Sequence, residues 1–332
     1  MSKVYIIAEA GVNHNGDVKL AYQLCDAAKE AGVDAIKFQT WKTEKIVTKE
    51  AALAEYQKNN CPEQESQFDM LKRLELSYVE FEQLKAYCDK IGIQFLSTPD
   101  TVEDMDFLLG LGMPLLKIGS GDVTNIPFLR EIGKRNVKVV ISTGMCTLSD
   151  VDIAYRELKN AGAEEVTLLH CTTNYPCPYD EVNLNAMLTM RDTLHCAVGY
   201  SDHTMGIEVP IAAVALGAEV IEKHFTLDRE MEGPDHKASL EPYELKQMVL
   251  SIRNIENALG DGIKRPNDSE VKNAEVVFKR IVAGKDIKEG EILDESNLSL
   301  LRSSVGIPAK YWDSVIGKAA EREYKQFEPI DL

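Results

Sequence analysis

The stretch Glu219–Thr226 ends an apolar run with side chains that can take part in chemistry. If it forms a strand, Glu222 and His224 share one face, because successive side chains of a strand point to opposite sides. A carboxylate and an imidazole on a mostly buried strand are costly to desolvate, so they need partners or a function. On this stretch alone, a core histidine bonded to a backbone carbonyl explains the pattern equally well.

Polar side chains stand in the same way at the ends of seven earlier apolar segments. In chain order they are Glu9 and Asn13; Lys37 and Gln39; Ser97 and Thr98; Lys117 and Ser120; Ser142 and Thr143; His170, Thr172 and Tyr175; and Ser201, Asp202 and His203. Because polar residues stand at the end of every one of these segments, a functional interpretation of Glu222 and His224 is favoured over a structural one.

Three kinds of chemistry are represented. Cations and hydroxyls suited to a phosphate or a carboxylate are Lys37, Lys117, Ser120, Ser142 and Ser201. His203 and His224 could bind a divalent metal ion and leave positions for substrate and water, although their separation of 21 positions is no local metal motif. Glu9, Glu222 and Asp235 are carboxylates that can move protons or bind sugar hydroxyls.

Each of these side chains also has a structural interpretation. A serine at a strand end commonly caps backbone groups, whereas a lysine at the end of a buried strand has less structural use. The other histidines are interpreted as structural or as supporting the site; they are His14, His170, His195 and His236.

Eight apolar segments are predicted to be strands. They are Val4–Ala8, Ala35–Thr40, Ile93–Thr98, Leu115–Ile118, Lys138–Ser142, Val166–His170, Ala197–Tyr200 and Glu219–Thr226. Helical patterns alternate with them at Val18–Ala31, Tyr78–Lys90, Val102–Leu109, Ile126–Arg135, Leu148–Asn160, Asn185–Leu194, Ile207–Leu216 and Pro242–Leu259. Residues 41–69 form a polar excursion, predicted to be a long surface loop with short helical pieces.

This alternation predicts an α/β fold, a (β/α)8 TIM barrel. An open doubly wound sheet is the alternative, but it would need a Gly-x-Gly-x-x-Gly turn after the first strand, and Gly11–Gly16 does not match. In a TIM barrel the active site lies at the carboxyl ends of the strands. The polar strand ends are therefore expected to meet in one site.

The composition narrows the classes of partner. With 54 acidic and 37 basic residues the net charge is -17, which argues against binding to nucleic acid or to an anionic membrane. No apolar run approaches the ~20 residues of a membrane span. The 7 cysteines include no Cys-x-x-Cys pair, so reduced thiols are expected. We expect a soluble, cytoplasmic protein.

A domain boundary is predicted after the last helical pattern. Residues 1–262 are assigned to the barrel, 263–278 to a linker, and 279–332 to a small domain of short strands and turns. A unit of this size is marginal as an independent fold. Arg302 ends one of its predicted strands, where it is either a surface arginine or a guanidinium delivered to a barrel mouth.

Motifs spread over essentially the whole chain carry a family resemblance. They are Ala8–Gly16, Ile36–Thr40, Lys117–Gly121, Ser142–Met145, His170–Pro176, Gly199–Thr204, Ile221–Asp228 and Gly233–Pro242. Together they resemble the sialic acid synthase family, the bacterial nonulosonate synthases of N-acetylneuraminate and legionaminate type. The C-terminal unit is similar to the family's antifreeze-like (SAF, β-clip) domain.

The resemblance implies condensation of phosphoenolpyruvate with an open-chain N-acylated aminohexose, giving a nine-carbon 2-keto acid and phosphate. It implies that His203 and His224 bind Mn²⁺, or another divalent ion such as Mg²⁺ or Co²⁺. It implies a phosphoenolpyruvate site made by Lys37, Lys117, Ser120, Ser142 and Ser201. The residues expected to hold the sugar or to move protons are Glu9, Gln39, Asp122, Thr173, Tyr175 and Asp235.

The family also implies a homodimer with a swapped C-terminal domain, in which Arg302 contacts the N-acyl group of the sugar in the partner's site. Departures from the family pattern cluster near the expected sugar site: Asp100-Thr101, Asp122, Thr173-Asn174 and Ser303–Gly306. Both N-acetylmannosamine and a 2,4-diacetamido-2,4,6-trideoxymannose are therefore retained as acceptors, the first for an N-acetylneuraminate synthase and the second for a legionaminate synthase.

Two other functions are compatible with parts of the pattern. A Schiff-base aldolase would use Lys37, Lys117 or Lys223 as its nucleophile and would be indifferent to chelators. A non-catalytic binding protein could retain the barrel as a scaffold, although the intact lysines and histidines argue against it.

Overall fold

The computed structural model describes residues 3–53 and 66–331 of the chain. These residues divide into two compact units, one ending at Gly260 and the other beginning at Asp261. Residues 54–65 of the predicted surface loop lie outside the described residues. Each unit is described below by itself.

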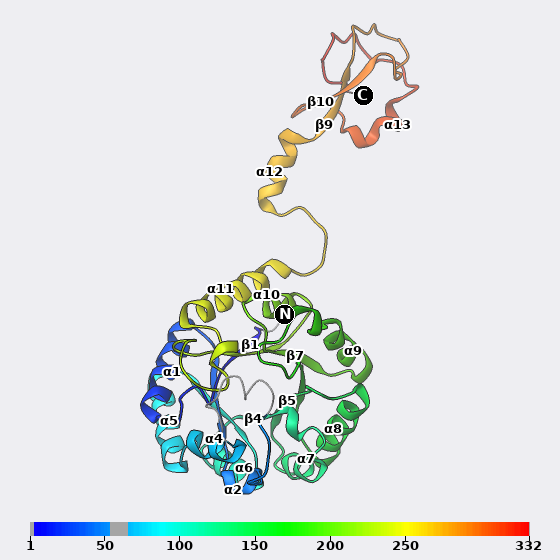
Figure 1. The fold of residues 1–332 in the computed structure, drawn as a ribbon. Helices are drawn as coiled ribbons and strands as arrows, with labels where there is room; N and C mark the ends of the chain where they lie inside the picture. The colour runs from blue at the N-terminus through cyan, green and yellow to red at the C-terminus, as the bar shows by residue number, and fades with distance from the viewer. Residues whose placement is uncertain (1–2, 54–65, 332) are drawn as a thin grey trace. The chain divides into compact units, whose positions relative to one another are not determined.

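The first unit is a parallel barrel of eight strands, as predicted (Figure 1). The strands are β1 (Tyr5–Gly11), β2 (Ala35–Thr40), β3 (Gln94–Pro99), β4 (Leu115–Ile118), β5 (Lys138–Ser142), β6 (Val166–His170), β7 (Ala197–Asp202) and β8 (Val220–His224). They are hydrogen-bonded in the order β3-β2-β1-β8-β7-β6-β5-β4, and β3 packs beside β4 to close the ring.

Helices cover the outside of the barrel in Figure 1. They are α1 (Val18–Ala31), α5 (Tyr78–Ile91), α6 (Val102–Gly110), α7 (Ile126–Gly133), α8 (Leu148–Ala161), α9 (Asn185–Leu194), α10 (Glu208–Ala215) and α11 (Pro242–Leu259). Their starts follow local chemistry: the side chains of Asp17, Ser77 and Thr147 each accept a hydrogen bond from the first turn of the helix they cap.

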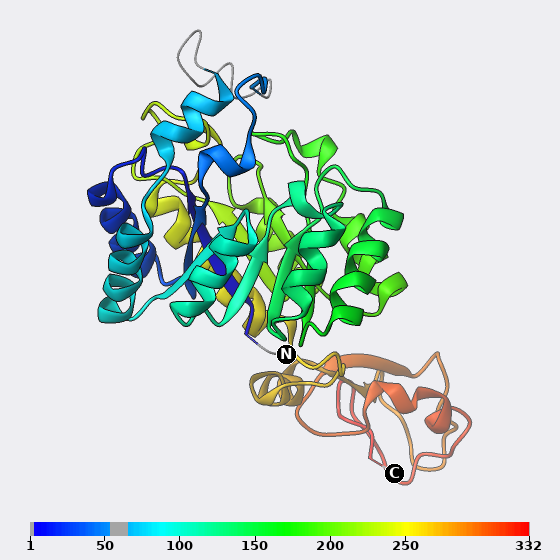
Figure 2. The ribbon, with the colours of Figure 1, turned by 90° about the horizontal axis from the view of Figure 1, so that it is seen from below.

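The strands are buried on both faces, which explains their continuous apolar sequences. In β1, for example, Ile6, Ile7 and Ala8 are all fully buried between the barrel interior and the helices. Only near the carboxyl ends do polar side chains replace them. Figure 2 shows the barrel from the side, so that the carboxyl ends of the strands lie at one end of the barrel and their amino ends at the other.

Two short helices, α2 (Thr43–Ile46) and α4 (Gln67–Leu74), follow β2 on the carboxyl-end side of the barrel (Figure 2). The sequence predicted a surface loop with short helical pieces, and α2 and α4 confirm the helical pieces. The region is not wholly a surface loop, because Trp41 is buried in a small apolar cluster with Val12, Met70 and Leu74. Part of the excursion is therefore packed on the barrel, while other described residues of it, such as Glu44 and Lys45, are exposed. A short amphipathic pattern broken by polar residues concealed this packing.

The second unit contains α12 (Asp268–Val277), β9 (Lys279–Ala283), β10 (Leu298–Arg302) and the one-turn helix α13 (Trp312–Val315). Strands β9 and β10 are antiparallel. The unit has an apolar core of its own, made by Ile281, Ala283, Ile287, Leu293, Leu298, Val315, Ala320, Tyr324 and Ile330. Arg302 is the exposed last residue of β10.

Two further sequence expectations bear on the whole chain. The cysteines within the described residues are free thiols, in line with the predicted reduced state, and Cys61 lies outside them. None of the helices that the structure describes combines the length and the apolar character needed to cross a membrane.

Candidate active site

A cavity of about 150 Å³ opens among the carboxyl ends of the strands and is called the inner cavity below. Its lining residues are Glu9, Lys37, Gln39, Thr98, Asp100, Lys117, Gly119, Ser120, Ser142, Tyr175, Ser201, His203, Glu222 and His224. Ten of the residues predicted from the sequence to form the site therefore lie around one space: Glu9, Lys37, Gln39, Lys117, Ser120, Ser142, Tyr175, Ser201, His203 and His224.

Two buried lysines share one carboxylate at the floor of the inner cavity. Lys117 Nζ lies 3.3 Å from Glu222 Oε1, and Lys37 Nζ lies 3.9 Å from Glu222 Oε2. Lys37 also forms an ion pair of 2.7 Å with Glu9 Oε2. Ser201 donates a hydrogen bond of 3.1 Å to Glu222. The carboxylates offset the cost of burying two ammonium groups.

Hydroxyl and amide groups complete these contacts. Lys117 donates to Ser142 Oγ at 2.8 Å, and Lys37 donates to Thr98 Oγ1 at 3.0 Å. Gln39 donates to Glu9 Oε1 at 3.0 Å. Both lysine amines are thus held in fixed positions at the cavity wall, where an anion would find two cations already oriented.

The surroundings push the pKa values of the two glutamates apart. Burial raises the pKa of Glu9 to about 7, although Lys37 opposes the shift. Burial alone would also raise the pKa of Glu222, but Lys117 and Lys37 outweigh it and lower that pKa below its usual value. Glu222 is therefore an ionised structural carboxylate, whereas Glu9 can gain or lose a proton near neutral pH.

A bulge in β1 sets the position of Glu9. The register against β2 shifts between Glu9 and Gly11. Gly11 has a positive φ of 50°, and a Cβ atom there would meet Glu9 Oε1 at 3.2 Å. A larger residue at position 11 would strain the backbone and crowd the carboxylate.

Two imidazoles face each other at one side of the cavity, with ring centroids 5.4 Å apart. His203 Nδ1 is bonded to the carbonyl oxygen of Thr172 at 2.6 Å, which leaves Nε2 as the nitrogen for another ligand. His224 Nδ1 is buried and has no hydrogen-bond partner among the described residues, and Asp235 Oδ2 lies 3.7 Å from it. The ring of Tyr175 lies 4.1 Å from that of His203.

The two histidines have the properties of metal ligands. Burial lowers the pKa of His203 to about 4, and burial together with the nearby cations lowers the pKa of His224 well below its usual value. Both rings are therefore neutral, which is the form that binds metal. Within residues 3–53 and 66–331 no group of three His, Cys, Asp or Glu side chains has metal-binding geometry. A metal here would need further ligands from substrate or water.

The other four predicted residues do not line the inner cavity. Asp235 is buried beside His224. Asp122 lines an adjoining cavity. Thr173 has a buried hydroxyl without a partner in the described part of the chain. Arg302 belongs to the second unit.

Asp100 and Gly119 were missed as site residues. Asp100 directly follows Pro99, the last residue of β3, so the rule that strand ends face the site would have included it. The sequence pattern recorded it only as a departure from the family.

Lys223, one of the three lysines considered for a Schiff base, is fully buried away from the cavity. It forms an ion pair of 2.5 Å with Asp202 and also donates to the carbonyl oxygen of Thr204. Alternation along β8 places it on the face opposite to Glu222 and His224. Its role is structural, and only Lys37 and Lys117 remain as amines at the cavity.

An eight-stranded parallel barrel with lysines, histidines and carboxylates gathered at its strand ends is the architecture of a TIM-barrel enzyme. The chain belongs to the NeuB family, whose model matches residues 24–264, and the SAF domain model matches residues 280–329. It is accordingly an enzyme of the sialic and legionaminic acid synthase type, as the sequence motifs predicted.

Similar proteins cover nearly the full length. An N,N'-diacetyllegionaminic acid synthase from Campylobacter jejuni is 49% identical over 99% of both chains. One of the same name from Legionella pneumophila is 47% identical over 94% of this chain and 89% of its own. The crystal structure of an N-acetylneuraminic acid synthetase from Leptospira borgpetersenii is 36% identical, covers 82% of this chain and 91% of its own, and superposes with a TM-score of 0.73.

Proposed function

We propose that this enzyme condenses phosphoenolpyruvate with an open-chain N-acylated aminohexose, releasing phosphate and forming a nine-carbon 2-keto acid. The observation that carries the proposal is the pair of oriented, buried amines of Lys37 and Lys117 beside Ser142 and Ser201 in the inner cavity. Phosphoenolpyruvate carries a phosphate and a carboxylate on one small skeleton, so two fixed cations suit it.

The acceptor we propose is 2,4-diacetamido-2,4,6-trideoxymannose, which would make the product N,N'-diacetyllegionaminic acid. The similarity to two synthases of that product, at 49% and 47% identity, supports this choice over N-acetylmannosamine. The human relative, an N-acetylneuraminate-9-phosphate synthase, is 35% identical. N-acetylmannosamine, the first acceptor inferred from the motifs, becomes the second candidate.

We also propose that His203 and His224 hold Mn²⁺, or Mg²⁺ or Co²⁺ in its place. Their neutral, facing rings and the unpartnered Nδ1 of His224 fit such an ion. When bound, the ion would act as a Lewis acid that polarises the aldehyde of the acceptor.

The residues of the chain would divide the remaining work. Lys37, Lys117 and the serines orient phosphoenolpyruvate so that, as its C2–C3 double bond opens, C3 forms the new bond to the aldehyde carbon. The aldehyde oxygen takes up a proton and becomes a hydroxyl. Water adds to C2, and Glu9, with its pKa near 7, accepts a proton from it. Phosphate then leaves with the bridging oxygen, so the water oxygen becomes the keto oxygen, and the lysines neutralise the departing charge.

Phosphate release tests this function. Purified enzyme with phosphoenolpyruvate should release phosphate only when an acceptor is added. The product mass should equal that of the acceptor plus phosphoenolpyruvate plus water, less phosphate. Activity should disappear with a chelator and return with manganese. Borohydride trapping of a lysine with undiminished activity in chelator would favour the aldolase instead, and phosphate release without any acceptor would contradict the condensation.

For the second unit we propose a swapped homodimer in which Arg302 contacts the acceptor bound to a partner's barrel. Arg302 is exposed at the end of β10, and α12 buries none of its residues within the described structure. The exposed apolar side chains on and after α12 include Val271, Val276 and Phe278.

Mixing two inactive variants tests this arrangement. Arg302→Ala keeps a sound barrel, and Lys117→Met keeps a sound second unit. In a swapped dimer, subunits exchanged between the two variants would form one complete site per heterodimer and regain activity. If the arginine served its own barrel, no heterodimer would hold a complete site and the mixture would stay inactive.

A further inference from the structure

A second cavity of about 540 Å³ adjoins the inner cavity and is called the outer cavity below. It is lined by Lys45, Ile46, Val47, Gln67, Leu71, Asp100, Gly121, Asp122 and Asn125. Asp100 lines both cavities, so the two spaces share a wall. A ligand with one end among the lysines of the inner cavity could therefore extend past Asp100 into the outer one.

The outer cavity has a different chemical character from the inner one. Its acidic side chains are Asp100 and Asp122, and its lysine, Lys45, forms an ion pair with Glu103. Ile46, Val47 and Leu71 give it an apolar wall. The rest of the lining is polar and includes Lys45, Gln67 and Asn125. A cavity that combines polar groups with a small apolar wall suits a neutral group that carries hydrogen-bonding atoms together with methyl groups.

Asp100 is the acidic side chain of this cavity without a partner among the described residues. Asp122 accepts a hydrogen bond of 2.9 Å from Asn125 Nδ2, whereas the Asp100 carboxyl makes no hydrogen bond or ion pair with any residue the structure describes. Burial, reinforced by the charges of Asp122 and Asp104, raises the pKa of Asp100 to about 8. In the protonated form this half-buried carboxyl still has an oxygen that can accept a hydrogen bond, so it can bind a ligand that donates to it.

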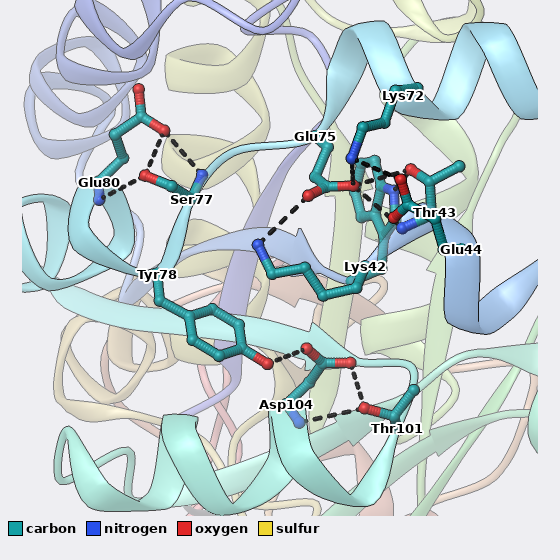
Figure 3. A network of polar contacts seen from close by, with 11 residues as sticks. Lys42, Thr43, Glu44, Lys72, Glu75, Ser77, Tyr78, Glu80, Thr101 and Asp104 are labelled. Atoms are coloured by element: carbon teal, nitrogen blue, oxygen red, sulfur yellow. Dashed lines mark hydrogen bonds and ion pairs between the residues drawn. The ribbon is translucent and has the colours of Figure 1, made fainter.

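The network of polar contacts drawn in Figure 3 connects the helices that supply part of the lining of the outer cavity. Glu75, just after α4, accepts hydrogen bonds from Lys42, from the backbone and hydroxyl of Thr43, and from Lys72. These bonds tie α2 to α4, the two helices that supply Lys45, Ile46, Gln67 and Leu71 to the outer cavity.

A second part of the same network fixes the chain next to Asp100. Asp104 accepts hydrogen bonds of 2.6 Å from Tyr78 and 2.5 Å from Thr101 (Figure 3). Thr101 in turn caps α6 and follows Asp100 directly. The outer cavity is therefore preorganised by bonds that leave the Asp100 carboxyl unused.

We propose that the outer cavity is the specificity site for the acceptor, and that Asp100 selects sugars with a second acylamino group and a terminal methyl. This inference rests on the proposed function. The Asp100 carboxyl accepts a hydrogen bond from the second amide N–H. The acyl methyl and the terminal methyl lie against Ile46, Val47 and Leu71.

The physical reason for the selectivity is that the cavity places one hydrogen-bond acceptor, the Asp100 carboxyl, beside an apolar wall. A hydroxylated sugar can donate to Asp100 as well, but a hydroxyl placed against Ile46, Val47 and Leu71, where the deoxy sugar has its methyl group, loses hydrogen bonds to water. A diacylated deoxy sugar satisfies Asp100 and removes methyl surface from water at the same time.

The test compares Asp100→Leu, Asp100→Asn and the matched control Asp106→Leu, a surface position on α6 that is paired with Arg135. For each, kcat/KM is measured with 2,4-diacetamido-2,4,6-trideoxymannose and with N-acetylmannosamine, together with KM for phosphoenolpyruvate. Thermal melting reports whether each variant is folded.

We expect Asp100→Leu to lower kcat/KM for the diacetamido sugar by about tenfold or more, because it removes a buried acceptor. Asp100→Asn, which retains an amide oxygen, should recover part of the loss. KM for phosphoenolpyruvate should change less than about twofold, since two oriented lysines hold that substrate. Asp106→Leu should behave like the wild type.

Equal losses for both acceptors, or a rise in KM for phosphoenolpyruvate that matches the loss with the sugar, would overturn the role of Asp100. An unchanged ratio of the two acceptors in Asp100→Leu would overturn it as well. Failure of the wild type to release phosphate with either acceptor is a distinct result, and it would remove the proposed function itself.

Discussion

The inner and outer cavities draw their side chains from different parts of the fold. Strand ends of the barrel supply Lys37, Lys117 and Glu222 to the inner cavity. Loops and the short helices α2 and α4 supply most of the outer one. The inner residues are tied to one another by ion pairs, whereas Asp100, on the shared wall, is not.

The pKa values of two carboxyl groups illustrate this difference in pairing. Glu222 and Asp100 are both desolvated, yet the lysines lower the pKa of the first, while burial and neighbouring carboxylates raise the pKa of the second. The paired carboxylate of Glu222 is structural before substrate arrives, whereas the carboxyl of Asp100, unpaired within the described residues, is available to a ligand. This contrast suggests that the chemical step belongs to the strand ends and the choice of acceptor to the loops.

The largest expected effect comes from breaking the inner pairing. Lys117→Met should reduce kcat by about a thousandfold or more, because it removes a cation that holds substrate and stabilises the departing phosphate. The acceptor preference of the residual activity should not change. The measurement is phosphate release with both acceptors.

Lys138→Met is the matched control for this loss, since Lys138 begins β5 and is exposed. A similar loss in the control would mean that the effect is not specific to the inner cavity. An altered acceptor preference in Lys117→Met would contradict the assignment of acceptor choice to the outer cavity.

A smaller effect should appear in the pH dependence of stability. The pKa of Asp100 in the folded protein, about 8, lies above its ordinary value of 3.8, so the folded state binds the proton more tightly. The stability linked to this proton is present at low pH and is lost as pH rises through about 8. Asp100→Asn removes the titration, so its melting temperature relative to the wild type should rise between pH 5 and pH 8.

Other carboxyl groups titrate in both proteins and largely cancel in that difference. Asp106→Asn provides the reference, because Asp106 is an exposed ion-pair partner of Arg135. A difference between Asp100→Asn and the wild type that stays constant with pH would mean that Asp100 is solvated or paired, contrary to the contrast with Glu222.

The smallest effect is expected at the apolar wall. Val47→Thr replaces one methyl group of the outer cavity by a hydroxyl of nearly equal size. The preference for the diacetamido sugar over N-acetylmannosamine should fall by about threefold to tenfold, the value of one buried methyl group. Competition between the two acceptors, read by product mass, measures it. Val79→Thr, at an exposed site on α5, should leave the preference unchanged.

Much of the barrel could be predicted because its signals are local. Strands β2, β4, β5 and β6 begin and end where the apolar segments do, and α1 spans the predicted helical pattern Val18–Ala31. The inner cavity follows from these strands, since a parallel barrel brings all carboxyl ends to one rim. The apolar pattern of the strands and the polar residues at their ends were thus enough to predict that one site contains Glu9, Lys37, Lys117, His203 and His224.

The outer cavity could not be predicted in this way. Trp41 is buried by Met70 and Leu74, which follow it by about thirty residues across a segment with little periodicity. The pKa of Asp100 depends on the nearby charges of Asp122 and Asp104. Asp100 lines two cavities, and residues of α2 and α4 form part of the outer one.

The amino-acid sequence by itself therefore determined the barrel, its order of strands and the set of side chains at their ends. Only the tertiary structure decided which lysines share Glu222, which lysine is locked to Asp202, and which aspartate remains unpaired. The physical reason is that periodicity and capping act between residues close in the chain. Desolvation and charge pairing depend instead on neighbours that folding brings together from distant segments.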